Sequence, residues 1–86
     1  EGFYLKNYPN PFTHETVIQY KLIEASEVEL SLYNAAGRKI ESLFNELQSP
    51  GNYAIEWNST GIKSGIYFCR LKVNGNVQTQ KMIVSQ

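Results

Sequence analysis

Hydrophobic and polar residues alternate along most of the chain in short segments. In one of them Ile18, Tyr20 and Leu22 fall on one face, with the polar Gln19 and Lys21 between them. A period of two places successive side chains on opposite faces of a β-strand, so each such segment predicts a strand with one apolar face. The predicted strands are Val17–Leu22, Glu27–Tyr33, Lys39–Phe44, Asn52–Asn58, Gly65–Val73 and Val77–Val84, with a further short strand at Phe3–Lys6.

Turn residues separate these segments. Asn74 and Gly75 accept the positive φ angles of a type I′ turn, so they predict a hairpin between the last two strands. Between Arg38 and Leu47 the apolar residues recur every three or four positions, as in a helix. Ten residues isolated among strands nevertheless favour a strand there.

Six or seven short strands bounded by turns predict an all-β fold, an antiparallel β-sandwich in which a second sheet covers the apolar face of the first. The 86 residues are enough for one domain, here residues 1–86. We expect Trp57 and Leu71 in its core. Cys69 lies on the same face as Leu71, so we expect a buried, unreactive thiol. Because the first residue is Glu1, we expect the chain to be a piece of a longer polypeptide.

The composition argues against most catalytic and binding chemistry. Eight basic and eight acidic residues give a net charge of zero, which does not favour nucleic acid or an anionic membrane surface as partner. No apolar run is long enough to insert in a membrane as a helix. One cysteine, one histidine and no aspartate leave no set of metal ligands and no catalytic triad. We therefore predict a protein that is not an enzyme and needs no cofactor or metal.

The most unusual stretch is the proline-rich strap, residues 7–12. Pro9 and Pro11 each lack an amide donor, so this segment cannot be a central strand. We expect it to run extended along an edge of the sandwich, held by Tyr8 and Phe12.

Six blocks, in order, resemble the C-terminal sorting domain of type IX secretion (Por secretion tail, type A). They are Asn7-Tyr8-Pro9-Asn10-Pro11-Phe12, Thr16–Leu22, Val28–Arg38, Tyr53–Asn58, Ser64–Leu71 and Lys81–Val84. The residues that match the structural motif of the family are Asn7, Pro9, Asn10, Pro11, Phe12, Gly37 and Trp57. The chain departs from the family pattern at Ile23, at Asn58 and at Ser85-Gln86, where members commonly have proline, aspartate and a terminal cation.

The resemblance implies an immunoglobulin-like sandwich that directs an N-terminally fused cargo protein, through the periplasm, to the cell surface or the medium. It implies as partners the outer-membrane export machinery and a sortase-like surface peptidase, with the domain itself a monomer. The residues that look like sorting elements lie on one strand and on the closing strand, residues 77–86. They are Ser64, Gly65, Ile66, Tyr67, Arg70, Lys81, Met82, Ile83 and Val84.

Two other functions fit parts of the pattern. The immunoglobulin-like domain of flagellar hook-capping proteins, an assembly scaffold, shares the proline-rich opening. A carbohydrate-binding module of a surface enzyme would use exposed aromatic residues, for which Tyr4, Tyr8, Phe12 and Tyr33 are candidates. An aromatic row on one sheet would favour that last function.

Overall fold

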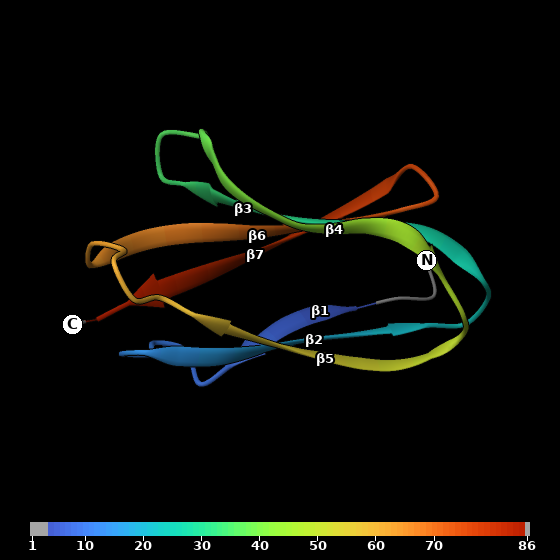
Figure 1. Cartoon of the computed structure of the whole chain (residues 1–86), viewed down its shortest axis with the longest axis horizontal. Helices are drawn as coiled ribbons and strands as arrows, with labels where there is room; N and C mark the ends of the chain where they lie inside the picture. The colour runs from blue at the N-terminus through green and yellow to red at the C-terminus, as the bar shows by residue number, and fades with distance from the viewer. Residues whose placement is uncertain (1–3, 86) are drawn as a thin grey trace.

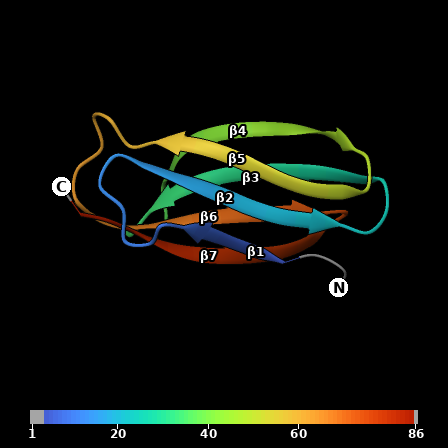
Figure 2. The same cartoon turned by 90° about the horizontal axis from the view of Figure 1, so that it is seen from below.

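The computed structural model describes residues 4–85 as seven strands in two antiparallel sheets that pack face to face (Figure 1). The strands are β1 (Leu5–Tyr8), β2 (Glu15–Leu22), β3 (Ser26–Asn34), β4 (Lys39–Gln48), β5 (Gly51–Asn58), β6 (Gly65–Val73) and β7 (Asn76–Val84). One sheet has the order β1-β2-β5 and the other β4-β3-β6-β7, and Figure 2 shows the first lying across the second. This arrangement is an immunoglobulin-like sandwich. The described part of the chain has no helix, and so none that could cross a membrane.

The predicted strands are confirmed, with some changes of bounds. The β6–β7 hairpin has the predicted two-residue turn, in which Asn74 and Gly75 have φ angles of 49° and 89°. The strand expected at Phe3–Lys6 is displaced, because β1 starts at Leu5 and ends at Tyr8; Phe3 lies outside the described residues. Its buried Asn7 donates to Thr16 Oγ1 at 3.0 Å, so this polar residue is satisfied inside a strand.

The core lies between the sheets and contains the apolar faces predicted from the alternation. Trp57 and Leu71 are both buried, as expected, and Trp57 packs edge-on against Phe12 with ring centroids 6.0 Å apart. Tyr20 stacks on Tyr53 at 5.0 Å. The buried hydrophobic residues are Phe12, Ile18, Tyr20, Leu22, Val28, Leu30, Leu32, Trp57, Cys69, Leu71, Val73, Met82 and Val84.

The helix-like spacing in β4 comes from two irregularities of the strand. Two consecutive residues of β3, Leu30 and Ser31, pair with Phe44 and Ser42 of β4, so Leu43 has no residue opposite it. In the same way Leu32 and Tyr33 pair with Glu41 and Lys39, which leaves Ile40 as an extra residue. A bulge inserts one residue and shifts the alternation that follows, which brings apolar residues to spacings of three and four. The segment is the predicted strand, but it continues to Gln48 rather than ending at Phe44.

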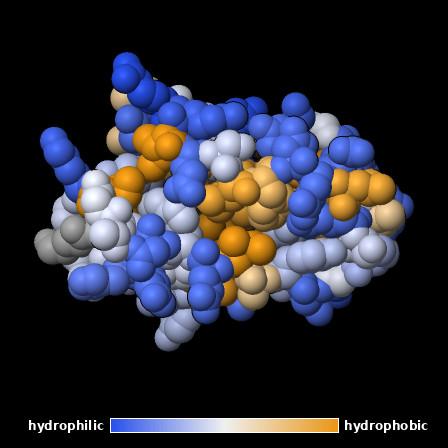
Figure 3. Space-filling view, in the orientation of Figure 1, coloured by the Kyte–Doolittle hydropathy of each residue, from blue (hydrophilic) through white to orange (hydrophobic). Residues whose placement is uncertain are grey.

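The bulged strand borders an open side of the sandwich. β4 and β5 are edge strands of opposite sheets, and apolar atoms gather between the two layers on this side (Figure 3). Trp57 Nε1 donates to Glu41 Oε1 at 3.0 Å, which links β5 to β4 across the layers.

The proline-rich strap connects the two sheets. Phe12 is in the core and forms a parallel bridge with Val84, whereas Asn7, at the other end, pairs within the three-stranded sheet. Both proline peptide bonds, Tyr8-Pro9 and Asn10-Pro11, are cis. The expectation that Tyr8 anchors the strap is wrong: its side chain is 75% exposed, because β1 turns alternate side chains outward and Asn7 takes the inward position.

Candidate functional site

Eight of the nine predicted sorting residues come together at one end of the sandwich. The ladder between β6 and β7 pairs Gly65 with Val84, Ile66 with Ile83, and Tyr67 with Met82. Ser64 precedes β6 directly, and the next pair joins Phe68 to Lys81. The carboxyl end of the described chain lies at this same end (Figure 1). Two segments separated in sequence therefore form one surface.

The exposure of these residues divides them into two groups. Ser64, Gly65, Ile66 and Lys81 are exposed, with Ile66 at 42%, and Ile83 is half-buried. Met82 and Val84 are buried in the core because they occupy the inward positions of β7, and Tyr67, which pairs with Met82, is half-buried on the same face. In the folded domain a partner can reach the first group directly, whereas the second group holds the strand in place. We call Ser64, Gly65, Ile66, Lys81 and Ile83 the closing surface.

A hollow of about 300 Å³ adjoins the closing surface. Its walls are the segment from Lys63 to Tyr67 and the turn of Asn34, Ala35 and Ala36. The Asn34 side-chain oxygen accepts the amides of Ala36 and Arg38 at 3.0 and 2.9 Å, and Gly37 has a φ of 86°, which fixes the turn. On the other wall, Tyr67 Oη donates to the Lys63 carbonyl at 2.7 Å. The sequence did not predict that this turn lies beside the closing surface, because the proximity depends on the pairing of β3 with β6.

The strap covers part of the outer edge of β7. Asn10 donates its side-chain amide to the Lys81 carbonyl and accepts the Ile83 amide, both at 2.9 Å. Phe12 donates to the Ile83 carbonyl at 3.0 Å and accepts from Ser85 at 2.8 Å. The second half of the closing strand is therefore not an open sheet edge, because these backbone groups already have partners. Among residues 4–85, no backbone group pairs with the outward side of Val77 or Thr79.

Arg70 lies apart from the other predicted residues. It projects from the middle of β6 on the outer face of the four-stranded sheet, with its guanidinium 5.8 Å from the centre of the Tyr33 ring. It pairs with Ser31 on one side and Thr79 on the other. A role for Arg70 in sorting stays a prediction.

Two titratable groups of the core, Cys69 and Tyr20, have raised pKa values. Burial raises the pKa of the Cys69 thiol from 9.0 to about 12, so this side chain is protonated at neutral pH. Burial also raises the pKa of Tyr20 to about 12. The Tyr20 hydroxyl donates to Gln48 Oε1 at 2.6 Å. Across the described residues, no three His, Cys, Asp or Glu side chains are grouped in a way that could hold a metal ion.

Comparison with known proteins gives one family. The family model of the secretion system C-terminal sorting domain matches residues 6–85, which is nearly the whole chain. Among curated proteins, no sequence matches the chain at a significant level. The family is one of sorting signals for type IX secretion, and it is not an enzyme family. Because the match covers the strap, nearly all of the sandwich and the closing strand as far as residue 85, the chain belongs to the family of secretion system C-terminal sorting domains.

Proposed function

We propose that the export machinery in the outer membrane recognises this domain through the closing surface. A type IX sorting domain directs its cargo to the cell surface or the medium, and some part of its folded surface has to be read for that to happen. The observation that supports the closing surface is the cross-strand pair of Ile66 and Ile83 beside Lys81. This pair leaves apolar side chains accessible next to a positive charge, at the end where β7 closes the fold.

The contact that fits this surface is one between side chains. The strap already occupies the backbone groups of Lys81 and Ile83 on the outer edge, so a receptor cannot add a strand there without displacing Asn10 and Phe12. An apolar anchor and an exposed cation, by contrast, are available as folded. The receptor is therefore expected to offer an apolar pocket with a carboxylate beside it.

We further propose the route and the fate of the domain. The cargo is fused to its N-terminal side and crosses the periplasm before export, and a sortase-like surface peptidase then removes the domain. The pairing of β1 with β2 keeps Leu5 on the three-stranded sheet, and Figure 2 shows the start of β1 at the opposite end of the sandwich from the C-terminus and the closing surface. A cargo attached before β1 would thus leave the closing surface free for the receptor.

The proposal is tested by fusing residues 1–86 behind a periplasmic reporter in a host with type IX machinery. The intact fusion should reach the surface or the medium. The substitutions Lys81→Glu and Ile66→Ser should leave most of the reporter in the periplasm, because each removes one of the two exposed features of the closing surface. The mass of the exported reporter shows whether the domain has been cut off.

Matched variants elsewhere on the sandwich control for charge and polarity. Lys21→Glu reverses an exposed lysine on β2, and Ile23→Ser removes an isoleucine that is 63% exposed after that strand. Both should be exported like the intact fusion. Export of the double variant Lys81→Glu, Ile66→Ser at the intact level would place recognition outside the closing surface.

A further inference from the structure

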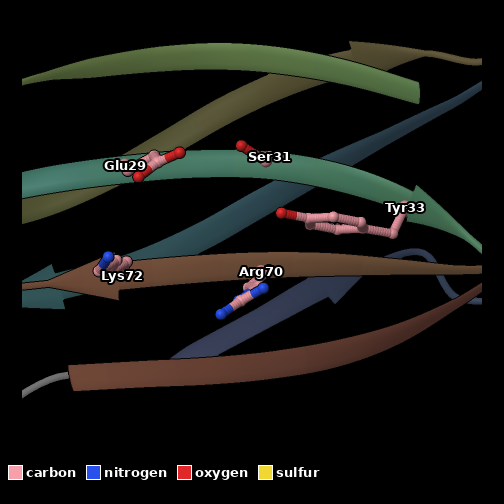
Figure 4. Close-up of a pocket in the computed structure, with 5 residues that line it drawn as sticks. All are labelled: Glu29, Ser31, Tyr33, Arg70 and Lys72. Atoms are coloured by element: carbon pink, nitrogen blue, oxygen red, sulfur yellow. The ribbon is translucent and has the colours of Figure 1, made fainter. Parts of the chain in front are cut away.

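A small hollow lies on the outer face of the four-stranded sheet, away from the closing surface. It measures about 140 Å³ and is lined by Glu29, Ser31, Tyr33, Arg70 and Lys72 (Figure 4). The residues come from the central strands β3 and β6, where Glu29 pairs with Lys72 and Ser31 with Arg70. Neighbouring strands on both sides hold this ladder, so the side chains start from a rigid base.

Ser31 is the unusual residue of the hollow. The alternation places it on the polar face of β3, yet its side chain is only 2% exposed, because the strands on either side enclose it. Its hydroxyl is buried and has no hydrogen-bond partner among the described residues. Buried hydroxyl groups are nearly always satisfied, so this one calls for a partner that enters the hollow from outside.

Two cations stand beside that hydroxyl. Arg70 and Lys72 are exposed and project from the same face of β6. The carboxylate of Glu29 forms an ion pair with Lys39 of the neighbouring strand, with 3.7 Å between Lys39 Nζ and Glu29 Oε2, rather than with Arg70 or Lys72. Across residues 4–85, neither the Arg70 guanidinium nor the Lys72 ammonium forms an ion pair with a carboxylate. Cations of this kind are the groups that proteins use to bind a carboxylate.

The rest of the lining selects among the ligands that carry a carboxylate. Glu29 disfavours a small, highly charged anion such as phosphate, but its oxygens can accept hydrogen bonds from neutral hydroxyl groups. In Figure 4 the long axis of the Tyr33 side chain runs along the strands and its ring is seen edge-on, and the Arg70 guanidinium lies 5.8 Å from the centre of that ring. The ring thus adds apolar surface beside the cation. A second hollow of about 240 Å³ shares Tyr33 and Arg70 and adds Phe68 and Thr79, which leaves room for a ring beyond the carboxylate.

We propose that this face binds an acidic sugar, a pyranose ring that carries a carboxylate. Arg70 and Lys72 hold the carboxylate, Ser31 and Glu29 bond to ring hydroxyls, and Tyr33 packs against the ring. A simple anion would leave Tyr33 and Glu29 without a role, and a neutral sugar would leave both cations unpaired. This inference concerns a different surface from the one proposed for export, and neither depends on the other.

The test is a nuclear magnetic resonance titration of the 86-residue chain with glucuronate at constant ionic strength. The amide signals of Ser31, Tyr33 and Arg70 should shift and saturate, with a dissociation constant of about 1 mM, since a shallow site holds a small ligand weakly. Glucose has the ring without the carboxylate, and acetate has the carboxylate without the ring. Both should bind roughly tenfold more weakly.

Variants assign the roles of the lining residues. Arg70→Gln and Lys72→Gln should each weaken glucuronate binding roughly tenfold, because each removes a charged partner. Ser31→Ala should weaken it by a few fold and should also stabilise the domain, because it removes an unpaired buried hydroxyl. Lys21→Gln removes a cation from the other sheet and should bind glucuronate as the natural chain does.

The source of the sugar is distinguished by adding a trimer of galacturonate. Tighter binding of the trimer than of the monomer indicates an acidic polysaccharide, and equal binding indicates a single residue; both support the proposal. If acetate bound as tightly as glucuronate, the proposal would be overturned, since the hollow would then recognise the negative charge alone. Shifts that do not saturate with any uronate, or equal binding by Arg70→Gln, would overturn it as well.

Discussion

Asn10 occupies the place of a neighbouring strand beside Ile83. Its side-chain oxygen accepts the Ile83 amide, and its side-chain nitrogen donates to the carbonyl two residues earlier, so one amide side chain satisfies two backbone groups of the edge. The strap thus protects the second half of β7, which carries Lys81 and Ile83 of the closing surface, from pairing with other chains. Because these hydrogen bonds of Asn10 are to the backbone of β7, a substitution at Asn10 tests the stability of this strand without changing the side chains of the closing surface.

Asn10→Ala should lower the free energy of unfolding by about 1–3 kcal/mol, because two backbone groups lose their partners. Urea denaturation measures this change, and hydrogen exchange should become faster at the Ile83 amide. Asn52→Ala, at an exposed position of β5, is the control and should change the free energy by less than about 0.5 kcal/mol. Unchanged exchange at Ile83 would mean that the strap does not hold this edge in solution.

Trp57→Ala should cost about 3–5 kcal/mol, since it opens a cavity beside Phe12 in a small core. We expect this variant to be unfolded. Trp57→Phe keeps much of the packing but loses the hydrogen bond to Glu41, and should cost less. In the natural chain the fluorescence maximum of Trp57 should lie well to the blue of free indole and move to it in denaturant. A native maximum equal to that of free indole would contradict the burial.

The domain should lose stability at alkaline pH. The unfolded chain releases the Cys69 and Tyr20 protons near pH 9.0 and 10.0, whereas the folded chain keeps both until about pH 12. Between these values the unfolded state binds fewer protons, so the free energy of unfolding falls as pH rises, by about 1.4 kcal/mol per pH unit for each group. Denaturation curves between about pH 8 and about pH 11 measure how the free energy of unfolding changes with pH.

Cys69→Ala provides the control, because it should remove the part of this slope that begins near pH 9.0. The thiol of the natural chain should react slowly with a labelling reagent in native buffer and rapidly in denaturant. Equal labelling rates in the two conditions would show that Cys69 is accessible in the folded domain.

Deleting Lys81–Gln86 should unfold the sandwich as well as abolish export. The deletion removes Met82 and Val84 from the core, together with the backbone partners of Asn10 and Phe12. Circular dichroism should show loss of the β spectrum, whereas Lys81→Glu should keep it. A folded deletion product would mean that the closing strand is dispensable for the fold, and export assays on truncated chains could then be interpreted directly.

The pattern of residues along the chain was sufficient for the elements and the core. Alternation in Ile18, Tyr20 and Leu22 depends only on the period of a strand, and all three are buried. The Asn74-Gly75 turn is likewise local, because its φ angles depend on the two residues themselves. The match of ordered blocks to a sorting domain also needed no coordinates.

Other features depend on contacts between distant residues, and only the tertiary structure decided them. The bulges at Leu43 and Ile40 arise from the pairing of β4 with β3, which is why their spacing resembled a helix. Asn10 reaches β7 across more than seventy residues of sequence, so the protected edge is invisible to any local pattern. The alternation places Ser31 on the solvent-facing side of β3. Its burial depends on the strands that lie on both sides of β3, which no local pattern of residue types reveals.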